Sequence, residues 1–118
     1  MEKIIDLSKV EEIFYDDKEE IAVLLKLFVA TFPEFMEAVE RCVHHDDIQG
    51  FKFAIHKFKS SCQFVAATSF VDRLRTLESI EMKDFNRHIP EIESIKAVSL
   101  QLKQEVEDYL GANERISE

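Results

Sequence analysis

The sequence predicts an all-α fold: an antiparallel up-down four-helix bundle with a short N-terminal helix across one end. Apolar residues recur at three- and four-residue spacings through most of the 118-residue chain, which is the period of a helix face. Two glycines and two prolines provide too few turns for a sandwich or barrel. A chain of this length buries roughly two thirds of its unfolded surface. We therefore expect one domain over residues 1–118, with frayed ends at residues 1–5 and 112–118.

The first two expected helices lie before residue 44. A short helix over about residues 6–14 carries its apolar residues on one side. Asp16-Asp17 then offers a cap and a favourable charge for the start of a long helix. The apolar stripe of that helix is Ile21, Leu24, Phe28, Phe32, Phe35, Val39 and Cys42. Pro33 falls within the stripe and is expected to bend the helix or to split it in two.

Three further helices follow a break at His44-His45-Asp46-Asp47, where an aspartate is the expected N-cap. The third helix has the most regular pattern, an a/d seam of Ile48, Phe51, Ile55, Phe58, Cys62 and Val65. A fourth helix starts near Thr68-Ser69, and its expected core residues are Phe70, Leu74 and Leu77. Residues 83–90 form a turn region. The last helix carries Ile92, Ile95, Ser99, Leu102, Val106 and Tyr109. Gly111 suits its C-terminal cap.

Charge and composition exclude several classes of protein. The net charge of −9 repels phosphate backbones, so nucleic acid is not expected as a partner. The N-terminus has no apolar run of signal-peptide length, and no run of about 18 apolar residues exists to span a membrane. Cys42 and Cys62 form no CxxC motif and lie on apolar stripes, which indicates reduced core cysteines. These features predict a cytoplasmic protein.

One face of the third helix lacks acidic residues. At about 100° per residue, His56 lies roughly 130° from the centre of the seam and so faces outward. Its exposed side is shared with Lys52, Lys59, Ser60 and Gln63. Residues 48–71 contain three lysines and no Asp or Glu, where composition alone predicts about five carboxylates. This face suits a dianion or an acidic partner. A central helix that simply carries fewer charges is the alternative explanation.

The chemistry of an exposed histidine in such a setting suits phosphoryl transfer. Imidazole is a nucleophile near neutral pH, and its Nε2 can accept a phosphoryl group. Lys59, one turn further on, can neutralise the added charge, and Ser60 and Gln63 can donate hydrogen bonds to its oxygens. The chain has no glycine-rich nucleotide loop, Walker motif or kinase motif. If His56 is phosphorylated, the donor must therefore be another protein, which predicts a carrier rather than an enzyme.

The sequence AIHKFKSSCQFVAATSFVDRLRTLE, residues 54–78, resembles the signature of histidine-containing phosphotransfer (HPt) domains of two-component phosphorelays. The resemblance implies that His56 is the phosphoryl acceptor and that Lys59 stabilises the phosphoryl charge. Further matching positions are Ser61, Ala67, Phe70 and Leu77-Glu78, with Phe32-Pro33 upstream. The likeness covers most of the chain, and its specificity is concentrated in the segment quoted.

Three positions depart from the family's pattern. The glycine that usually follows the lysine is Ser60 here, the second glycine is Ala66, and Ile55 replaces the alanine before the histidine. Small residues on this face let a response regulator approach closely. Since serine and alanine are still small, the resemblance implies that Ser60 and Ala66 belong to the partner-binding surface together with Lys52 and Gln63.

A second residue set concerns the orientation of the imidazole. For Nε2 to attack, Nδ1 must carry the proton and donate it to an acceptor. If the chain reverses near residues 66–69, Glu78 should lie at about the height of His56. Chemotaxis-kinase phosphotransfer domains, which look similar, have a glutamate at this offset that orients the histidine. A solvated surface acid is the alternative for Glu78. Arg75, one turn earlier, can contact the phosphoryl group or the partner.

The resemblance also implies the partners: a response-regulator receiver domain and a histidine kinase. No cofactor is expected on this chain, and Mg²⁺ is expected only on the partner receiver domain. A monomer is expected, because each stripe can be buried within one bundle. The docking face should be apolar with a polar rim, over the first helix and exposed parts of the second. Leu7 and Val10 can equally cap the bundle, and Phe64 is expected to be buried.

Two rival interpretations remain at this point. His44-His45-Asp46-Asp47 and His88 supply metal-ligand types, but a di-iron bundle needs paired Glu-x-x-His motifs, which the sequence lacks. The other rival is a helical adaptor that binds a signalling partner through the acid-free face around His56 without chemistry. That interpretation predicts that changing His56 leaves binding and function intact.

Overall fold

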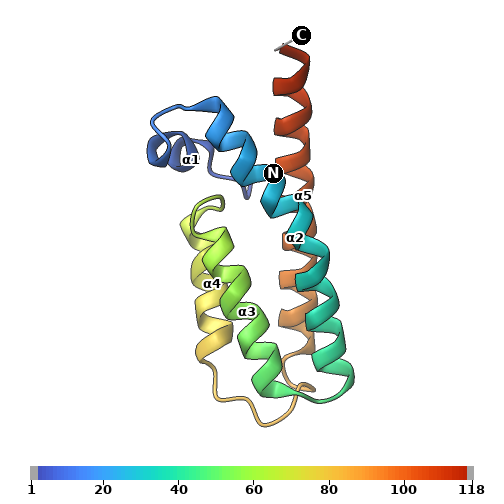
Figure 1. Cartoon of the computed structure of the whole chain (residues 1–118). Coiled ribbons are helices and arrows are strands. Elements are labelled where there is room, and N and C mark those ends of the chain that lie inside the picture. Colours follow the sequence, from blue (N-terminus) through green and yellow to red (C-terminus); the bar gives the residue numbers. More distant parts are fainter. Residues whose placement is uncertain (1–2, 117–118) are drawn as a thin grey trace.

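The computed structural model describes residues 3–116, with side chains as far as residue 112. Its helices are α1 (Leu7–Ile13), α2 (Lys18–His44), α3 (Ile48–Cys62), α4 (Thr68–Ser79) and α5 (Ile89–Ile116). Figure 1 shows α2, α3, α4 and α5 running alternately down and up, with α1 across one end. Helix α2 packs against both α3 and α5, and α3 packs against α4. The predicted helical bundle with a short N-terminal helix is confirmed.

Aspartates cap the first three helices, as predicted for α2 and α3. The carboxylates of Asp6, Asp17 and Asp47 each accept hydrogen bonds from backbone N–H groups two or three residues further on, at 2.9–3.2 Å. Each cap satisfies helix N–H groups that otherwise have no partner, and is worth about 1 kcal/mol. The caps explain why α2 and α3 start where they do. The start of α3 in turn sets the register of the residues that follow it.

Helix α2 continues through Pro33 as one 27-residue element, so the predicted split does not occur. Proline cannot donate to the carbonyl four residues earlier, which weakens the helix locally. Packing offsets this loss, because Phe32 and Phe35 on either side of the proline are both buried.

Five phenylalanines form the centre of the core. Phe58 of α3 stacks on Phe35 of α2, with ring centroids 3.8 Å apart and planes 7° from parallel. Three more rings surround Phe58 at 6.0–6.5 Å, those of Phe28, Phe32 and Phe70. Because they come from α2 and α4, the cluster fixes α3 between both neighbours. Residues on the opposite side of α3 from Phe58 therefore face solvent.

The N-terminal segment is paired rather than frayed over residues 4–6. The N–H groups of Ile4 and Ile5 donate to the Glu105 carboxylate of α5, at 2.7 and 2.8 Å. The Asp6 N–H donates to the Val65 carbonyl in the α3–α4 turn at 2.8 Å. The expectation of fraying over residues 1–5 is therefore wrong for this part, because its backbone groups have partners on two elements. Residues 1–2 lie outside the described residues.

The carboxyl-terminal end also differs from expectation. Gly111 does not end the helix, and α5 continues to Ile116. The glycine has no positive φ, and a Cβ at this position would meet nothing within 4 Å, so nothing about it interrupts the helix. The backbone is helical as far as residue 116, and residues 117–118 lie outside the described part. Over the described residues, no helix is long and apolar enough to cross a membrane.

Candidate functional site

His56 lies on the outward face of α3, in the middle of the helix. Its side chain is 54% exposed, as expected for a residue opposite the buried seam. The ring is held from the neighbouring helix: Nδ1 lies 2.6 Å from Oε1 of Glu78, near the carboxyl end of α4. The two helices run antiparallel from a turn at residues 63–67, so positions equally far from the turn meet. Glu78 therefore reaches the height of His56.

Glu78 is shared between His56 and Lys59. The Lys59 ammonium donates to its second oxygen, Oε2, at 2.6 Å. The Lys59 side chain is only 13% exposed and that of Glu78 is 25% exposed, so these charges are partly shielded from water. The hydrogen bond from Lys59 holds the pKa of the Glu78 carboxyl below its usual range, with a smaller contribution from His56, although partial burial opposes both. Glu78 is consequently ionised at neutral pH.

An ionised Glu78 determines the tautomer of the neutral His56 ring. A carboxylate can only accept hydrogen bonds, so Nδ1 must carry the proton. The remaining ring nitrogen, Nε2, then has a free lone pair. Nε2 is thus a nucleophilic nitrogen on an exposed ring, and the contact of Nδ1 with Glu78 fixes the orientation of that ring.

The other residues predicted around His56 are placed less uniformly. The Ser60 hydroxyl donates to the His56 carbonyl at 3.1 Å, so in this structure it bonds to the backbone of its own helix. Gln63 is exposed at the carboxyl-terminal cap of α3. Arg75 is exposed on α4 and forms an ion pair with Asp72 at 2.6 Å. That contact lies along α4 itself and does not reach across to α3.

Two predicted partner-binding residues need correction. Ala66 is 0% exposed, and its carbonyl accepts a hydrogen bond from the Lys9 ammonium at 2.8 Å. The N-terminal segment covers this position, so Ala66 cannot contact a docking protein. Lys52 is half-buried, and its ammonium donates to the Ile80 carbonyl at the end of α4. It is thus engaged within the domain rather than free to bind a phosphoryl group.

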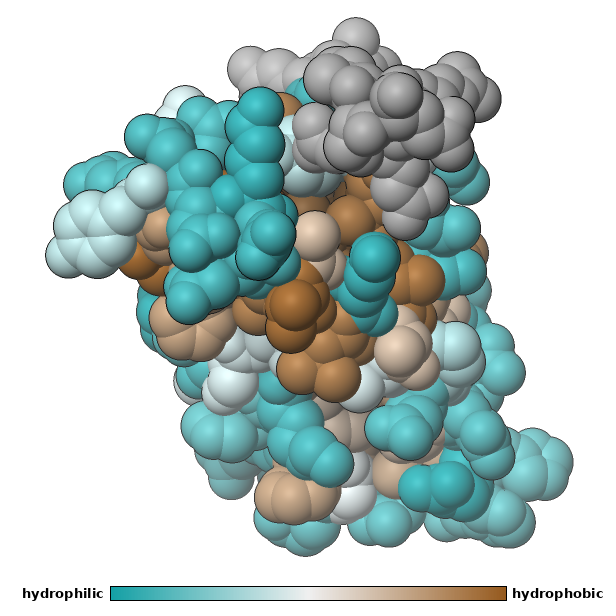
Figure 2. All heavy atoms as spheres, turned by 45° about the horizontal axis from the view of Figure 1, so that its top comes forward, coloured by the Kyte–Doolittle hydropathy of each residue, from teal (hydrophilic) through white to brown (hydrophobic). Residues whose placement is uncertain are grey.

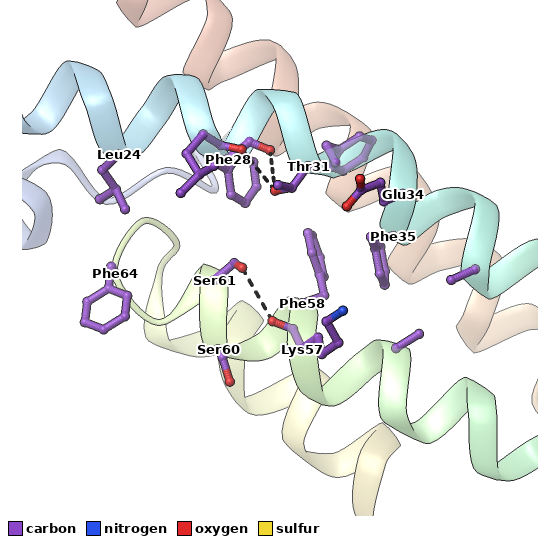
Figure 3. A pocket seen from close by; sticks show the side chains of 14 residues that line it. Leu24, Phe28, Thr31, Glu34, Phe35, Lys57, Phe58, Ser60, Ser61 and Phe64 are labelled. Carbon is purple, nitrogen blue, oxygen red and sulfur yellow. Dashed lines mark hydrogen bonds between the residues drawn. The ribbon is translucent and has the colours of Figure 1, made fainter.

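A groove lies between α2 and α3. His56 is not part of its lining, but Lys57, the next residue in the sequence, and Ser60, one helical turn after His56, are. The groove has a volume of about 470 Å³. Its lining includes Leu24, Leu27, Phe28, Thr31, Glu34, Phe35, Lys57, Phe58, Ser61 and Phe64. Figure 3 shows Leu24, Phe28 and Phe64 toward one end, and Glu34 and Lys57 toward the other.

The groove residues were not predicted as a site. Phe64 was expected to be buried, but it is 46% exposed, because α3 ends at Cys62 and the following turn directs the phenylalanine outward. Leu24 was assigned to the buried stripe, yet Leu25 takes that place and Leu24 is only half-buried. Figure 2 shows apolar atoms gathered at the centre of the face that it draws, with polar atoms around them. The sequence signal that could have indicated this groove is a leucine and a phenylalanine outside the expected apolar stripes, Leu27 and Phe64.

Two of the histidines named in the metal-binding alternative lie next to each other. The rings of His44 and His45 contact each other edge to face, with centroids 5.0 Å apart, at the carboxyl end of α2. In the part of the chain that the structure describes, no group of three or more His, Cys, Asp or Glu side chains is arranged to hold a metal ion.

Comparison with known proteins identifies the family. The sequence model of the Hpt domain matches residues 23–112, about three quarters of the chain. The chain belongs to the Hpt domain family. Among solved structures, this Hpt domain is similar to the histidine-containing phosphotransfer protein B (HptB) of Pseudomonas aeruginosa PAO1, with a TM-score of 0.77 and 18% sequence identity. The match covers 92% of this chain and 95% of that one. No curated protein matches the sequence.

Membership of the Hpt domain family defines the general role of this chain. Hpt domains are phosphocarriers of two-component phosphorelays, which interact with receiver and kinase domains, so this chain has a phosphotransfer role. The structural likeness to HptB extends the shared fold over almost the whole chain.

Proposed function

We propose that this Hpt domain is a phosphorelay intermediate in which His56 carries the phosphoryl group. The donor is the aspartyl phosphate of a hybrid histidine kinase's receiver domain, and the acceptor is the aspartate of a response regulator, both in the cytoplasm. The observation that carries the proposal is the contact of His56 Nδ1 with the Glu78 carboxylate at 2.6 Å, with Lys59 on the same carboxylate. It leaves Nε2 as the nucleophile.

The transfer step is a simple displacement. The Nε2 lone pair forms the N–P bond while the P–O bond to the aspartyl carboxylate breaks, and that carboxylate leaves as an anion. Nδ1 keeps its proton throughout, so no base has to remove one. The phosphorylated ring gains a positive charge, which the Glu78 carboxylate offsets. Onward transfer is the same step in reverse, to a different aspartate, with Mg²⁺ held by the receiver domain.

Lys59 has a second role in this proposal. It shares a carboxylate with His56 and lies one helical turn away, so its ammonium is within reach of a phosphoryl group on Nε2. The acid-free stretch of residues 48–71 serves the same end, because it presents no carboxylate that would repel the phosphoryl dianion or the acidic pocket of a receiver.

The groove between α2 and α3 is the proposed docking surface for the receiver domain. It is apolar near Leu24 and Phe64, and its α3 wall carries Lys57, the residue that follows His56 in the sequence. An apolar centre with a charged rim is the usual composition of a protein interface. Its position lets a receiver domain that covers the groove place its aspartate at Nε2.

Transfer of labelled phosphate tests the proposal. The protein is incubated with a hybrid kinase and ATP, or with a phosphorylated receiver domain, beside a His56→Gln variant. An acid-labile, base-stable label that is absent from His56→Gln is the expected result. If several kinases and receivers leave no label while one of them still binds, the adaptor interpretation is correct. A label that persists in His56→Gln would place the acceptor elsewhere.

The docking surface needs its own variants. Leu27→Asp and Phe64→Asp should slow transfer from a receiver by about tenfold or more, because each places a charge in the apolar part of the groove. Leu100→Asp is the matched control, since Leu100 is 51% exposed and lies on α5, outside the groove. Labelling by phosphoramidate, a small donor that needs no docking, should be unchanged in all three. Equal rates from a receiver in all three would exclude the groove.

A further inference from the structure

The carboxyl end of α4 has an unfavourable charge pattern of its own. The last turn of a helix carries a partial negative charge on its carbonyl groups, so cations are favoured there and anions are not. Helix α4 has no basic residue in its last turn, yet it carries Glu78 there. Within α4 alone, the ionised Glu78 carboxylate is therefore in an unfavourable electrostatic position.

Two lysines of α3 supply the missing cations. The Lys59 ammonium reaches the Glu78 carboxylate itself at 2.6 Å. The Lys52 ammonium donates to the Ile80 carbonyl, which belongs to the carboxyl-terminal cap residue of α4. The two lysines lie seven residues apart, one turn on either side of His56, and so the end of α4 is attached to α3 at two points that bracket the histidine.

The contact at Ile80 fixes the backbone close to Glu78. Ile80 follows Glu78 by two residues, and its N–H donates to the Thr76 carbonyl at 3.1 Å as the last turn closes. Beyond it the chain leaves the helix, since Ile80 has extended dihedral angles. The Ile80 carbonyl has no helical N–H ahead of it to bond. Lys52 therefore satisfies an acceptor that the helix leaves open and holds the turn that presents Glu78.

We propose that Lys52 is a positioning residue for the phosphoryl-accepting histidine. It does not touch the reacting nitrogen. It holds the last turn of α4 against α3, so that the Glu78 carboxylate meets Nδ1 of His56 and keeps the proton there. The effect on phosphorylation rests on the proposed role of His56, but the effect on the proton position of the ring does not.

The position of the ring proton is the first measurement. Nitrogen-15 NMR of the two ring nitrogens, at mildly alkaline pH where histidine is neutral, reports which one carries it. Wild type should show His56 mainly as the Nδ1–H tautomer. In Lys52→Met the Nε2–H tautomer should increase, because the Glu78 acceptor is less firmly placed. Lys52→Arg keeps a cationic donor on a long side chain and should restore much of the wild-type pattern.

The second measurement is the rate of phosphorylation by phosphoramidate. In this reaction the N–P bond to Nε2 forms while the P–N bond of the donor breaks and ammonia leaves. The rate should fall by about three- to tenfold in Lys52→Met, a range set by the net worth of one ordinary hydrogen bond. Lys83→Met is the control for loss of charge, since Lys83 is exposed in the turn after α4. It should match wild type in both measurements.

The outcomes separate the two proposals. If Lys52→Met is folded by circular dichroism and keeps both the wild-type tautomer and the wild-type rate, Lys52 only stabilises the fold and the inference is wrong. If the variant unfolds, Lys52→Arg decides, because a wild-type tautomer in a folded Lys52→Arg supports the positioning role and an altered one refutes it. A tautomer shift in a protein that no donor can phosphorylate would uphold the positioning role and refute the phosphocarrier role of His56.

Discussion

Replacing Phe58 by alanine should be among the most destabilising single changes in the domain. Phe58 is 5% exposed, and burial of a phenylalanine side chain is worth about 1.5–3 kcal/mol by transfer alone. The cavity left behind raises the usual total to roughly 3–5 kcal/mol. Four rings from α2 and α4 contact Phe58, so both helices would have to move to close the cavity. We therefore expect a loss of about 4 kcal/mol.

Phe53→Ala on the same helix is the matched control. Its ring is 65% exposed and contacts the Lys57 ammonium, which lies 5.6 Å from the ring centroid. Loss of that contact, worth about 0.5 kcal/mol at an exposed site, is offset by the better helix propensity of alanine. The free energy of unfolding should change by no more than about 0.5 kcal/mol.

Urea unfolding followed by circular dichroism measures both variants. With a slope of about 1–3 kcal/mol per molar urea, Phe58→Ala should lower the midpoint by roughly 2 M while the slope stays the same. Phe53→Ala should leave the midpoint almost unchanged. If the two variants shift the midpoint equally, Phe58 is not central to the core and the account of how α3 is fixed fails.

Three further predictions concern other parts of the molecule. Because the pKa of Glu78 is lowered in the folded state, its contribution to stability should be complete above about pH 4.3 and be lost as the pH falls through the lowered value. The difference in unfolding free energy between wild type and Glu78→Gln should therefore shrink steadily as the pH falls below about 4.3, and a constant difference down to about pH 3 would contradict this. Gly50→Ala should lower the melting temperature despite the helix propensity of alanine. A Cβ at this position would lie 2.4 Å from Oδ2 of the capping Asp47 and 2.9 Å from Sγ of Cys42. A higher melting temperature would mean that the cap can move aside. Burial raises the pKa of the Cys62 thiol, so a thiol reagent should modify Cys62 only as the protein unfolds. Modification of the native protein at the rate of a free thiol would instead show that α3 opens locally.

Periodic features of this chain could be predicted from its sequence. The seam of α3 follows from burial at every third or fourth residue, and Phe51, Ile55, Phe58, Cys62 and Val65 are all buried. The meeting of His56 and Glu78 could also be anticipated, because two antiparallel helices that share a short turn bring positions equally distant from it to the same height. Both inferences use only regular geometry.

Contacts made by irregular backbone could not be predicted in this way. The acceptor for Lys52 is the Ile80 carbonyl, and every residue has a carbonyl, so no side-chain pattern marks it. Ala66 looked like an accessible small residue, but residues 4–9 cover it from a distant part of the sequence. Phe64 follows the last turn of α3, where the helical period that predicted its burial no longer applies.

The pairing of the N-terminal segment has a consequence for the order in which the domain assembles. The hydrogen bonds from Ile4 and Ile5 to Glu105 join residues 101 and 100 positions apart, whereas the Asp6 N–H bonds to the turn after α3. Closing so long a loop is entropically unfavourable until both acceptors already lie side by side. The segment can therefore dock only after α3, α4 and α5 have come together. We expect it to be the last part to join during folding and the first to detach, so slow amide exchange at Ile4 and Ile5 would report that the whole bundle is closed.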